Sequence, residues 1–358
     1  MMDKNQSQQA GDNAQQTQYA NCSITVVNGI DEKRAREISL EVFNTLRKEL
    51  TNEAFETAKE RVQKLENVLI PRIQKIDEAF NAFSDPAFQY TLYKAQKSAA
   101  KTERPADYEL LSELLIRRIE KGFDRNIRAG INKAVEIVDD LSDEALLGLT
   151  VSFFMEQFTP TNGIISEGLD YFDKILQAIS YDKLPTESEW IDNLDVLGAV
   201  RMSVSSTTSR ISYEDYFSEN TTGYWSVGIK KGSENHSKAI AMLNEVSIDT
   251  PFLYDHELNP SYVRLPVSNE KIIDNFSFIT DKQKKVLHEI FSMYENNNQL
   301  LQKTIKRNLY TELEARKYLN DARQWWNNLP IFYKITSVGK NVAYANAQRI
   351  CPDLPPLK

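Results

Sequence analysis

The feature that most constrains this chain is a stripe of apolar side chains between residues 55 and 83. The stripe recurs at spacings of three or four and comprises Phe55, Ala58, Val62, Leu65, Leu69, Ile73, Ile76, Phe80 and Phe83. Such spacing lines one face of an α-helix, and the run is long enough for about eight turns. We expect Pro71 to kink this helix, because proline removes one backbone hydrogen bond and clashes with the preceding turn.

A stripe of this length needs a partner helix, and two arrangements would supply one. Antiparallel packing against helices of the same chain is the favoured arrangement, and a coiled coil with a second copy is the alternative. Heptad-like spacing alone does not fix the partner. We therefore keep part of the stripe as a candidate association surface, namely Phe55, Val62, Leu65, Leu69, Ile73, Ile76 and Phe80.

The rest of the chain also shows helical periodicity, broken by short turns. The further periodic segments are residues 109–120, 127–138, 142–154, 168–179, 186–197 and 280–293. Capping residues mark helix starts, as at Asp85 before a proline and at Thr280 with Gln283 three residues on. We predict an all-α fold, a multi-helix bundle or array with a long kinked N-terminal helix. No period of about 20 to 50 residues repeats cleanly, so a solenoid is not supported.

Changes in composition along the chain predict four regions. Almost nothing in the Gln- and Asn-rich start can be buried, whereas Ser23 to Val27 is a short β-prone run. A polar stretch after Arg201 marks a boundary, and the aromatic residues of 213–267 stand among Gly, Pro and Asn, which indicates irregular loops. The predicted regions are a disordered polar leader (1–21), a helical bundle (22–200), a linker with irregular loops (201–279) and a basic helical module (280–358).

Charge and cysteine content limit the classes of protein to which the chain can belong. Its 43 Lys and Arg against 51 Asp and Glu give a formal charge of -8, which argues against a general binder of nucleic acid or anionic membranes. The two cysteines, Cys22 and Cys351, build neither a disulfide framework nor a thiolate zinc site. Neither an apolar signal segment nor a stretch of roughly 18 apolar residues occurs. We expect a cytoplasmic protein that does not span a membrane.

Motifs that carry catalysis are missing from the sequence. His236, His256 and His288 stand in separate segments, and His288-Glu289 lacks the second histidine of a zinc-protease helix. Neither a G-x-S-x-G elbow, a phosphate-binding P-loop nor a dinucleotide-binding glycine motif occurs. We therefore name no catalytic, cofactor-binding or metal-ligating residue, expect no cofactor, and favour a protein that is not an enzyme.

The C-terminal part is basic, unlike the rest. Between Asp281 and Arg349 there are 12 Lys or Arg and 6 Asp or Glu, a local charge of +6 that leaves -14 elsewhere. The order of elements from Thr311 to Arg349 is compatible with a winged-helix-like module. On that hypothesis, the residues that contact phosphates are Lys303, Lys306, Arg307, Arg316, Lys317 and Arg323. The favoured alternative is that they solvate helix faces or contact the acidic half of the chain.

Three segments resemble an uncharacterised family of helical bacterial proteins. They read FSDPAFQYTLYKAQK (Phe83 to Lys97), ELLSELLIRR (Glu109 to Arg118) and ITSVGKNVAYANAQR (Ile335 to Arg349). The resemblance implies a bacterial, cytosolic, helical protein and brings no activity or site residues with it. The ending is also similar to that of some abortive-infection proteins, which by association suggests defence against phage or a stress response.

Three functional hypotheses follow from these features. The leading hypothesis is a non-enzymatic helical interaction or scaffold protein, whose helical bundle binds a protein partner or a second copy. The second is a nucleic-acid-binding regulator that acts through its basic C-terminal module. The third is a toxic effector whose active site the sequence does not reveal.

Overall fold

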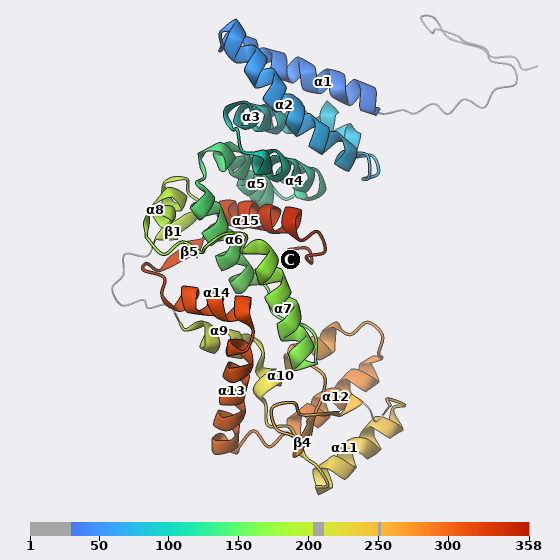
Figure 1. Ribbon diagram of the computed structural model, residues 1–358. Coiled ribbons are helices and arrows are strands. Elements are labelled where there is room, and N and C mark those ends of the chain that lie inside the picture. The colour runs from blue at the N-terminus through green and yellow to red at the C-terminus, as the bar shows by residue number, and fades with distance from the viewer. Residues whose placement is uncertain (1–29, 203–210, 250–251, 358) are drawn as a thin grey trace, which may run out of the picture.

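A computed structural model describes residues 30–202, 211–249 and 252–357. The described chain forms an elongated array of helices, with α1 and α2 at one end and α11 and α12 at the other (Figure 1). The prediction of an all-α, multi-helix fold is confirmed. The predicted polar leader and the β-prone run Ser23 to Val27 lie outside the described residues.

Five helices form the N-terminal end of the array. Their bounds are α1 Glu32–Asn44, α2 Asn52–Ile73, α3 Pro86–Lys101, α4 Pro105–Lys121 and α5 Arg125–Ile137, with 3-10 turns η1 Thr45–Lys48, η2 Ala79–Ser84 and η3 Val138–Asp140. Asp85 caps α3 as its sequence predicts, because its side chain accepts a hydrogen bond from the backbone N–H of Ala87 and Pro86 occupies the first helical position. Helix α2 packs against both α3 and α4.

The apolar stripe is buried within the chain, but it does not lie on a single helix. Helix α2 continues through Pro71 and ends at Ile73, and the stripe resumes in η2 after Glu78, which has a left-handed backbone with φ of 57°. Proline and this reversal together shorten the helix expected to reach Phe83. The α2 part of the stripe is buried, whereas Ile76 and Phe80 are half-buried against the same core.

The C-terminal helix α15 (Ser337–Ile350) completes the core of the N-terminal half. It packs against α4, α5 and α6 (Asp143–Gln157), helices that precede it by some 200 residues. Asn346 donates a hydrogen bond from Nδ2 to Oγ1 of Thr150 over 2.8 Å, and both side chains are fully buried. Helix α6 carries buried side chains on all its faces, because it lies at the centre of this packing.

Two short strands and four helices form the middle of the array. They are α7 Ile165–Ile179, α8 Glu189–Val196, β1 Val200–Met202, α13 Gln299–Glu314, α14 Lys317–Asn327 and β5 Tyr333–Ile335. Strand β5 pairs antiparallel with β1, so that Ile335 stands opposite Val200. The winged-helix-like arrangement is not confirmed, because the strand between α14 and α15 pairs with a strand from before residue 203.

The region expected to consist of irregular loops contains regular elements. They are α9 Tyr213–Asn220, α10 Thr222–Trp225, β2 Ile229–Lys230, α11 Glu234–Glu245, β3 Tyr254–Asp255 and β4 Tyr262–Arg264, followed by η5 Glu270–Asn275 and α12 Asp281–Ser292. The strands form a small sheet in the order β2-β4-β3. Helix α11 was missed because only two of its side chains, Ala239 and Leu243, are buried, too few for a visible period.

A second, smaller hydrophobic core joins α11, α12 and this sheet, and includes Ile229, Leu243, Leu287 and Ile290. The helices after residue 280 therefore pack in three places: α12 in the small core, α14 against α7 and α9, and α15 against the N-terminal half.

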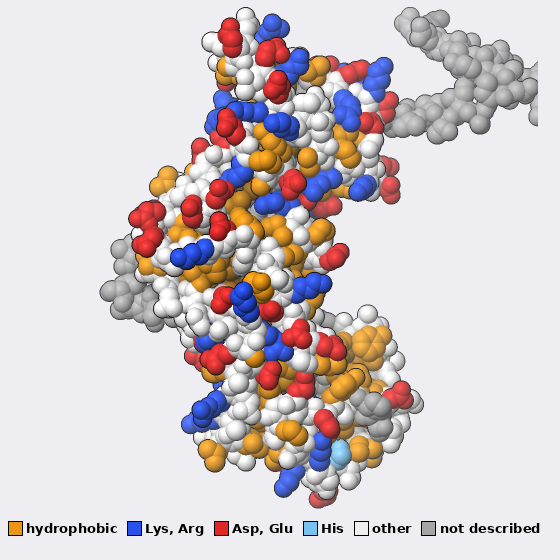
Figure 2. Space-filling view, viewed as in Figure 1, with side chains coloured by type: hydrophobic (Ala, Val, Ile, Leu, Met, Phe, Trp, Pro, Cys, Tyr) orange, Lys and Arg blue, Asp and Glu red, His pale blue; other side chains and the backbone are white. Residues whose placement is uncertain are grey.

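On the visible face, Lys and Arg side chains are interspersed with Asp and Glu side chains along the whole array (Figure 2). No helix in the described ranges combines the length and apolar character that a bilayer span requires.

A substitution at Gly339, in the first turn of α15, tests how closely this helix packs against its neighbours. A Cβ at this position would lie 2.1 Å from the carbonyl oxygen of Ala199 and 3.0 Å from Cγ2 of Ile335. Alanine normally stabilises a helix relative to glycine, but here the clash should make the substitution destabilising. We expect Gly339→Ala to lower the free energy of unfolding by about 1–3 kcal/mol in urea denaturation. Gln348→Ala on the same helix should change it by less than about 0.5 kcal/mol, and a stabilised Gly339→Ala protein would contradict the packing described.

Candidate functional site

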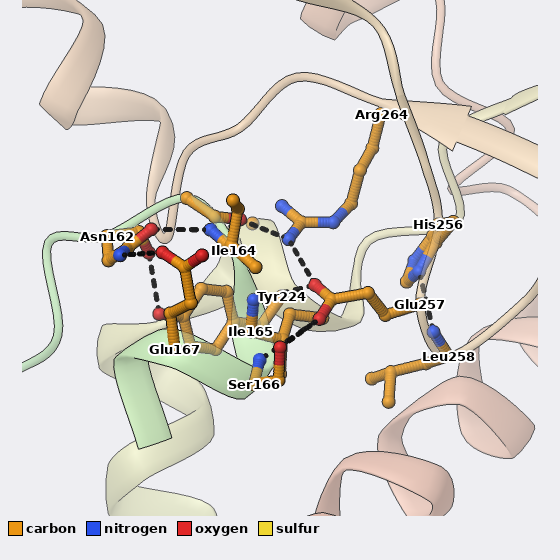
Figure 3. Close-up of polar contacts among 12 residues, drawn as sticks. Asn162, Ile164, Ile165, Ser166, Glu167, Tyr224, His256, Glu257, Leu258 and Arg264 are labelled. Atoms are coloured by element: carbon orange, nitrogen blue, oxygen red, sulfur yellow. Dashed lines mark hydrogen bonds and ion pairs between the residues drawn. The ribbon is translucent and has the colours of Figure 1, made fainter. Parts of the chain in front are cut away.

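The most deeply buried arginine in the described chain lies where β4 meets the start of α7 (Figure 3). Arg264 on β4 is 1% exposed. Its Nη1 donates hydrogen bonds to the carbonyl oxygens of Leu265 (3.0 Å) and Val267 (3.2 Å), and its Nη2 donates to that of Gly163. The carboxylate of Glu257 lies 3.5 Å from Nη2 and balances the charge. This buried guanidinium thus ties three chain segments together.

Glu257 also caps helix α7. Its carboxylate accepts hydrogen bonds from the backbone N–H of Ile165 (2.6 Å) and Ser166 (3.0 Å), and from Oγ of Ser166 (2.9 Å). Ile164, the residue before the helix, supplies no side-chain cap of its own. Burial of the Glu257 carboxyl opposes its ionisation, but the hydrogen bonds from Ser166 and Ile165 outweigh that effect and lower its pKa. A residue on a distant loop therefore satisfies the exposed donors of the helix.

The turn before α7 requires a glycine. A Cβ on Gly163 would lie 1.7 Å from the carbonyl oxygen of Pro266, so only glycine allows the two backbones to approach. Tyr224 donates a hydrogen bond from its hydroxyl to the carbonyl oxygen of Asn162 over 2.7 Å, and its ring lies 5.7 Å from the Arg264 guanidinium carbon. The Asn162-Gly163 turn expected from the sequence thus becomes the point at which the loop-rich segment docks.

His256 lies beside this network and is fully buried. Its Nε2 donates to the carbonyl oxygen of Ser226 over 2.8 Å, and its Nδ1 accepts from the backbone N–H of Leu258 over 3.2 Å. Burial lowers the pKa of His256 to about 4, so the ring is neutral near pH 7. Main-chain groups engage both ring nitrogens, so His256 holds segments together and is not paired with a nucleophile.

Three of the six proposed phosphate contacts are committed to acidic partners. Arg316 lies 2.7 Å from Asp170, Lys306 lies 3.2 Å from Asp215, and Arg323 forms an ion pair with Glu214. These acids belong to α7 and α9, in the acidic part of the chain, which agrees with the mixed charge of the surface (Figure 2). These three residues thus contact the acidic half of the chain, as the favoured alternative in the sequence analysis expects.

The other three proposed contacts, Lys303, Arg307 and Lys317, are exposed on α13 and α14. The ammonium nitrogen of Lys317 lies 5.0 Å from the ring centre of Tyr318. Binding of phosphates by the six residues stays a prediction. Within the described ranges, no three His, Cys, Asp or Glu side chains converge as a metal site would require.

A groove that the sequence did not reveal lies between α1, η1 and α3. It has a volume of about 380 Å³ and is lined by Val42, Thr45, Pro86, Gln89, Tyr90 and Tyr93. The Tyr90 side chain is 72% exposed. Helix α3 buries Phe88 and Leu92 in the core and packs Tyr93 partly against it, so Tyr90 is the aromatic residue of this helix that the core does not need. An aromatic residue outside the core-facing positions of a helix is the sequence feature that could have indicated this surface site.

The predicted association stripe provides no comparable surface. Its α2 residues Phe55, Val62, Leu65, Leu69 and Ile73 belong to the main core. Since α2 packs against α3 and α4 of its own chain, these side chains are already covered. A partner that binds the folded N-terminal helices must therefore contact other residues of that unit.

The Arg264–Glu257 pair yields a stability prediction. Glu257→Gln keeps the shape of the side chain but removes its charge, which leaves the Arg264 guanidinium as an unbalanced buried cation. We expect a loss of about 3 kcal/mol in the free energy of unfolding, measured by urea denaturation. Glu167→Gln in the same turn is the matched control, because Glu167 is exposed and its loss should cost less than about 1 kcal/mol. Equal losses in the two variants would disprove the role of Glu257.

His256 yields a prediction of pH dependence. Its pKa of about 4 lies below the ordinary 6.5, so its stabilising contribution is complete above pH 6.5 and is lost as the pH falls toward 4. Urea denaturation at pH 7, 6 and 5 should show stability falling by up to about 1.4 kcal/mol per pH unit from this residue, and His256→Asn should lack that component. His288→Gln should remove a contribution with the opposite pH dependence, one that is lost as the pH rises, because hydrogen bonds to Glu270 and Asp274 raise the His288 pKa. Equal pH slopes for the wild type and His256→Asn would refute the assignment.

Comparison with known proteins identifies a family but no activity. Neither a curated protein nor a solved structure matches the chain. A family model that carries the bare description ":-like" matches residues 29–356, nearly the whole chain. The chain therefore belongs to this family, whose description states no activity.

Proposed function

We propose that this protein is a non-enzymatic helical interaction protein that binds a protein partner through the groove between α1, η1 and α3. The observation that carries the proposal is the exposed Tyr90 ring beside a hollow lined by Val42, Pro86 and Tyr93. Buried aromatic anchors supply much of the affinity in protein–protein interfaces. The hollow of about 380 Å³ has room for one or two apolar side chains of a partner.

Two of the residues that line the groove, Tyr93 and Pro86, are held by contacts within the chain. Tyr93 donates a hydrogen bond from its hydroxyl to Glu49 over 3.1 Å, and Glu49 pairs with Lys97 at 3.0 Å. Pro86 begins α3 with a fixed backbone angle. Because these groups are already held in place, binding would cost less side-chain entropy than at a flexible surface.

Other exposed apolar side chains offer a weaker basis for binding. Phe123, Val196 and Leu300 are highly exposed but do not line the groove. Scattered apolar residues of this kind are normal on protein surfaces, whereas grooves lined by several such residues mark interaction sites. This contrast favours the groove as the contact surface.

The cellular setting is part of the proposal. The similarity of the ending to some abortive-infection proteins suggests a bacterial cytosolic role in defence against phage or in stress. The nucleic-acid-binding alternative has less support, because Lys306, Arg316 and Arg323 already pair with carboxylates. A toxic effector remains the third candidate, and growth arrest on expression would distinguish it.

The groove is tested by Tyr90→Ala in the full chain. A partner captured by wild-type protein from its host should be purified and titrated against each variant by calorimetry, with light scattering to detect a second copy. Loss of the Tyr90 ring should weaken binding, or dimerisation, by about tenfold or more.

Phe123→Ala is the matched control, because Phe123 is an exposed aromatic side chain on the turn after α4 that does not line the groove. It should bind as the wild type does. Equal affinity of wild type and Tyr90→Ala would exclude the groove as the contact surface. Salt-sensitive recovery of nucleic acid, lost in Lys303→Gln/Arg307→Gln, would instead support the alternative.

A further inference from the structure

A polar pocket lies where the C-terminal helix meets α4 and α5. It has a volume of about 560 Å³, and the lining side chains that can contact a ligand through polar atoms are Arg117, Asn126, Gln157, Ser337, Lys340 and Asn341. Among the described residues that line it, two are cations and none is a carboxylate. In a chain with a formal charge of -8, a pocket lined only by cationic and neutral groups favours an anion.

The guanidinium of Arg117 is held in one orientation. Its Nε donates a hydrogen bond to Oδ1 of Asn341 over 2.8 Å, and its central carbon lies 4.7 Å from the ring centre of Tyr344. Asn341 is itself 5% exposed and is fixed because its Nδ2 donates to the carbonyl oxygen of Ser337 over 2.8 Å. One edge and one face of the guanidinium are therefore occupied, and its orientation is set before a ligand binds.

The other edge of the same guanidinium is available. In the described part of the chain, the Nη atoms of Arg117 make no hydrogen bond and no ion pair, unlike those of Arg104, Arg316 and Arg323. Burial lowers the pKa of Arg117, and the nearby Tyr344 and the carboxylate of Glu120 offset that effect only in part. An arginine fork with two free donors fits two oxygens of a phosphate or carboxylate group.

The helix ends around the pocket add to this preference. Gly130 lets α5 approach α15 closely, since a Cβ there would lie 2.9 Å from Nδ2 of Asn341. Ser337 and Val338 form the first turn of α15, where backbone N–H groups are unpaired and the helix dipole is positive. Lys340 stands one turn further along the same helix, without an ion pair to any described residue.

We propose that this pocket binds the phosphate group of a small molecule. Arg117 would contact two phosphate oxygens through its Nη atoms, and Lys340 and the start of α15 would supply the remaining positive charge. The volume suits a small organic ligand, and Ile127 and Val338 offer apolar surface for its organic part. This site is separate from the groove at Tyr90 and does not depend on the proposed function.

Calorimetric titration of the full chain tests the site with three probes: inorganic phosphate, ADP and adenosine. Phosphate and ADP should each bind saturably at one site, and ADP more tightly if the natural ligand is an organic phosphate. Adenosine, which has no phosphate, should not bind. Arg117→Gln should weaken binding at least tenfold, because it removes charge-assisted hydrogen bonds.

Two further variants keep the test decisive. Lys340→Gln changes a side chain at the pocket rim and should weaken binding severalfold even if Arg117→Gln proves unstable. Lys238→Gln removes an exposed cation on α11, outside the residues proposed to contact phosphates, and should leave affinity unchanged. The proposal is overturned if no saturable binding of phosphate or ADP occurs below about 10 mM, if adenosine binds as well as ADP, or if Lys340→Gln and Arg117→Gln bind as the wild type does.

Discussion

The packing of α15 against α4, α5 and α6 is the constraint on which the rest of the structure depends. This helix comes from the end of the chain, yet it completes the core of the N-terminal half, where Asn346 and Thr150 form a buried hydrogen bond. The chain between α6 and α15 therefore extends along the array and comes back to these helices (Figure 1). The strand pair β1–β5 lies where the chain returns, since β5 leads directly into α15.

A second long-range contact, at the other end of the array, also returns the chain to an earlier helix. The loop-rich segment returns to α7 through Arg264 and Glu257, and the carboxylate of Glu257 serves both the arginine and the helix start. A buried ion pair adds little net stability by itself, because desolvation offsets its attraction. Its value here is positional, since the pair and the Gly163 turn together fix which segment docks against α7.

Local features of the chain were predictable from sequence and long-range ones were not. The stripe from Phe55 to Ile73 and the caps at Asp85 and Thr280 depend on neighbours within a few residues, so periodicity and capping rules found them. Helix α11 was missed because it buries too few side chains. The setting of Arg117 depends on Asn341, 224 residues away, and no local pattern contains such a contact.

The paired arginines clarify what is unusual about the unpaired one. At Arg104, Arg316 and Arg323, a carboxylate pairs with a partly buried guanidinium that holds two segments together. Arg117 also lies between segments but forms no ion pair with a described residue. A neutral amide and an aromatic ring orient its guanidinium, and the carboxylate of Glu120 offsets its burial only in part. An oriented charge that is only partly compensated, next to the start of α15, costs stability in the free protein. A bound anion would recover that cost and add its binding free energy to the α4–α5–α15 packing on which the fold depends.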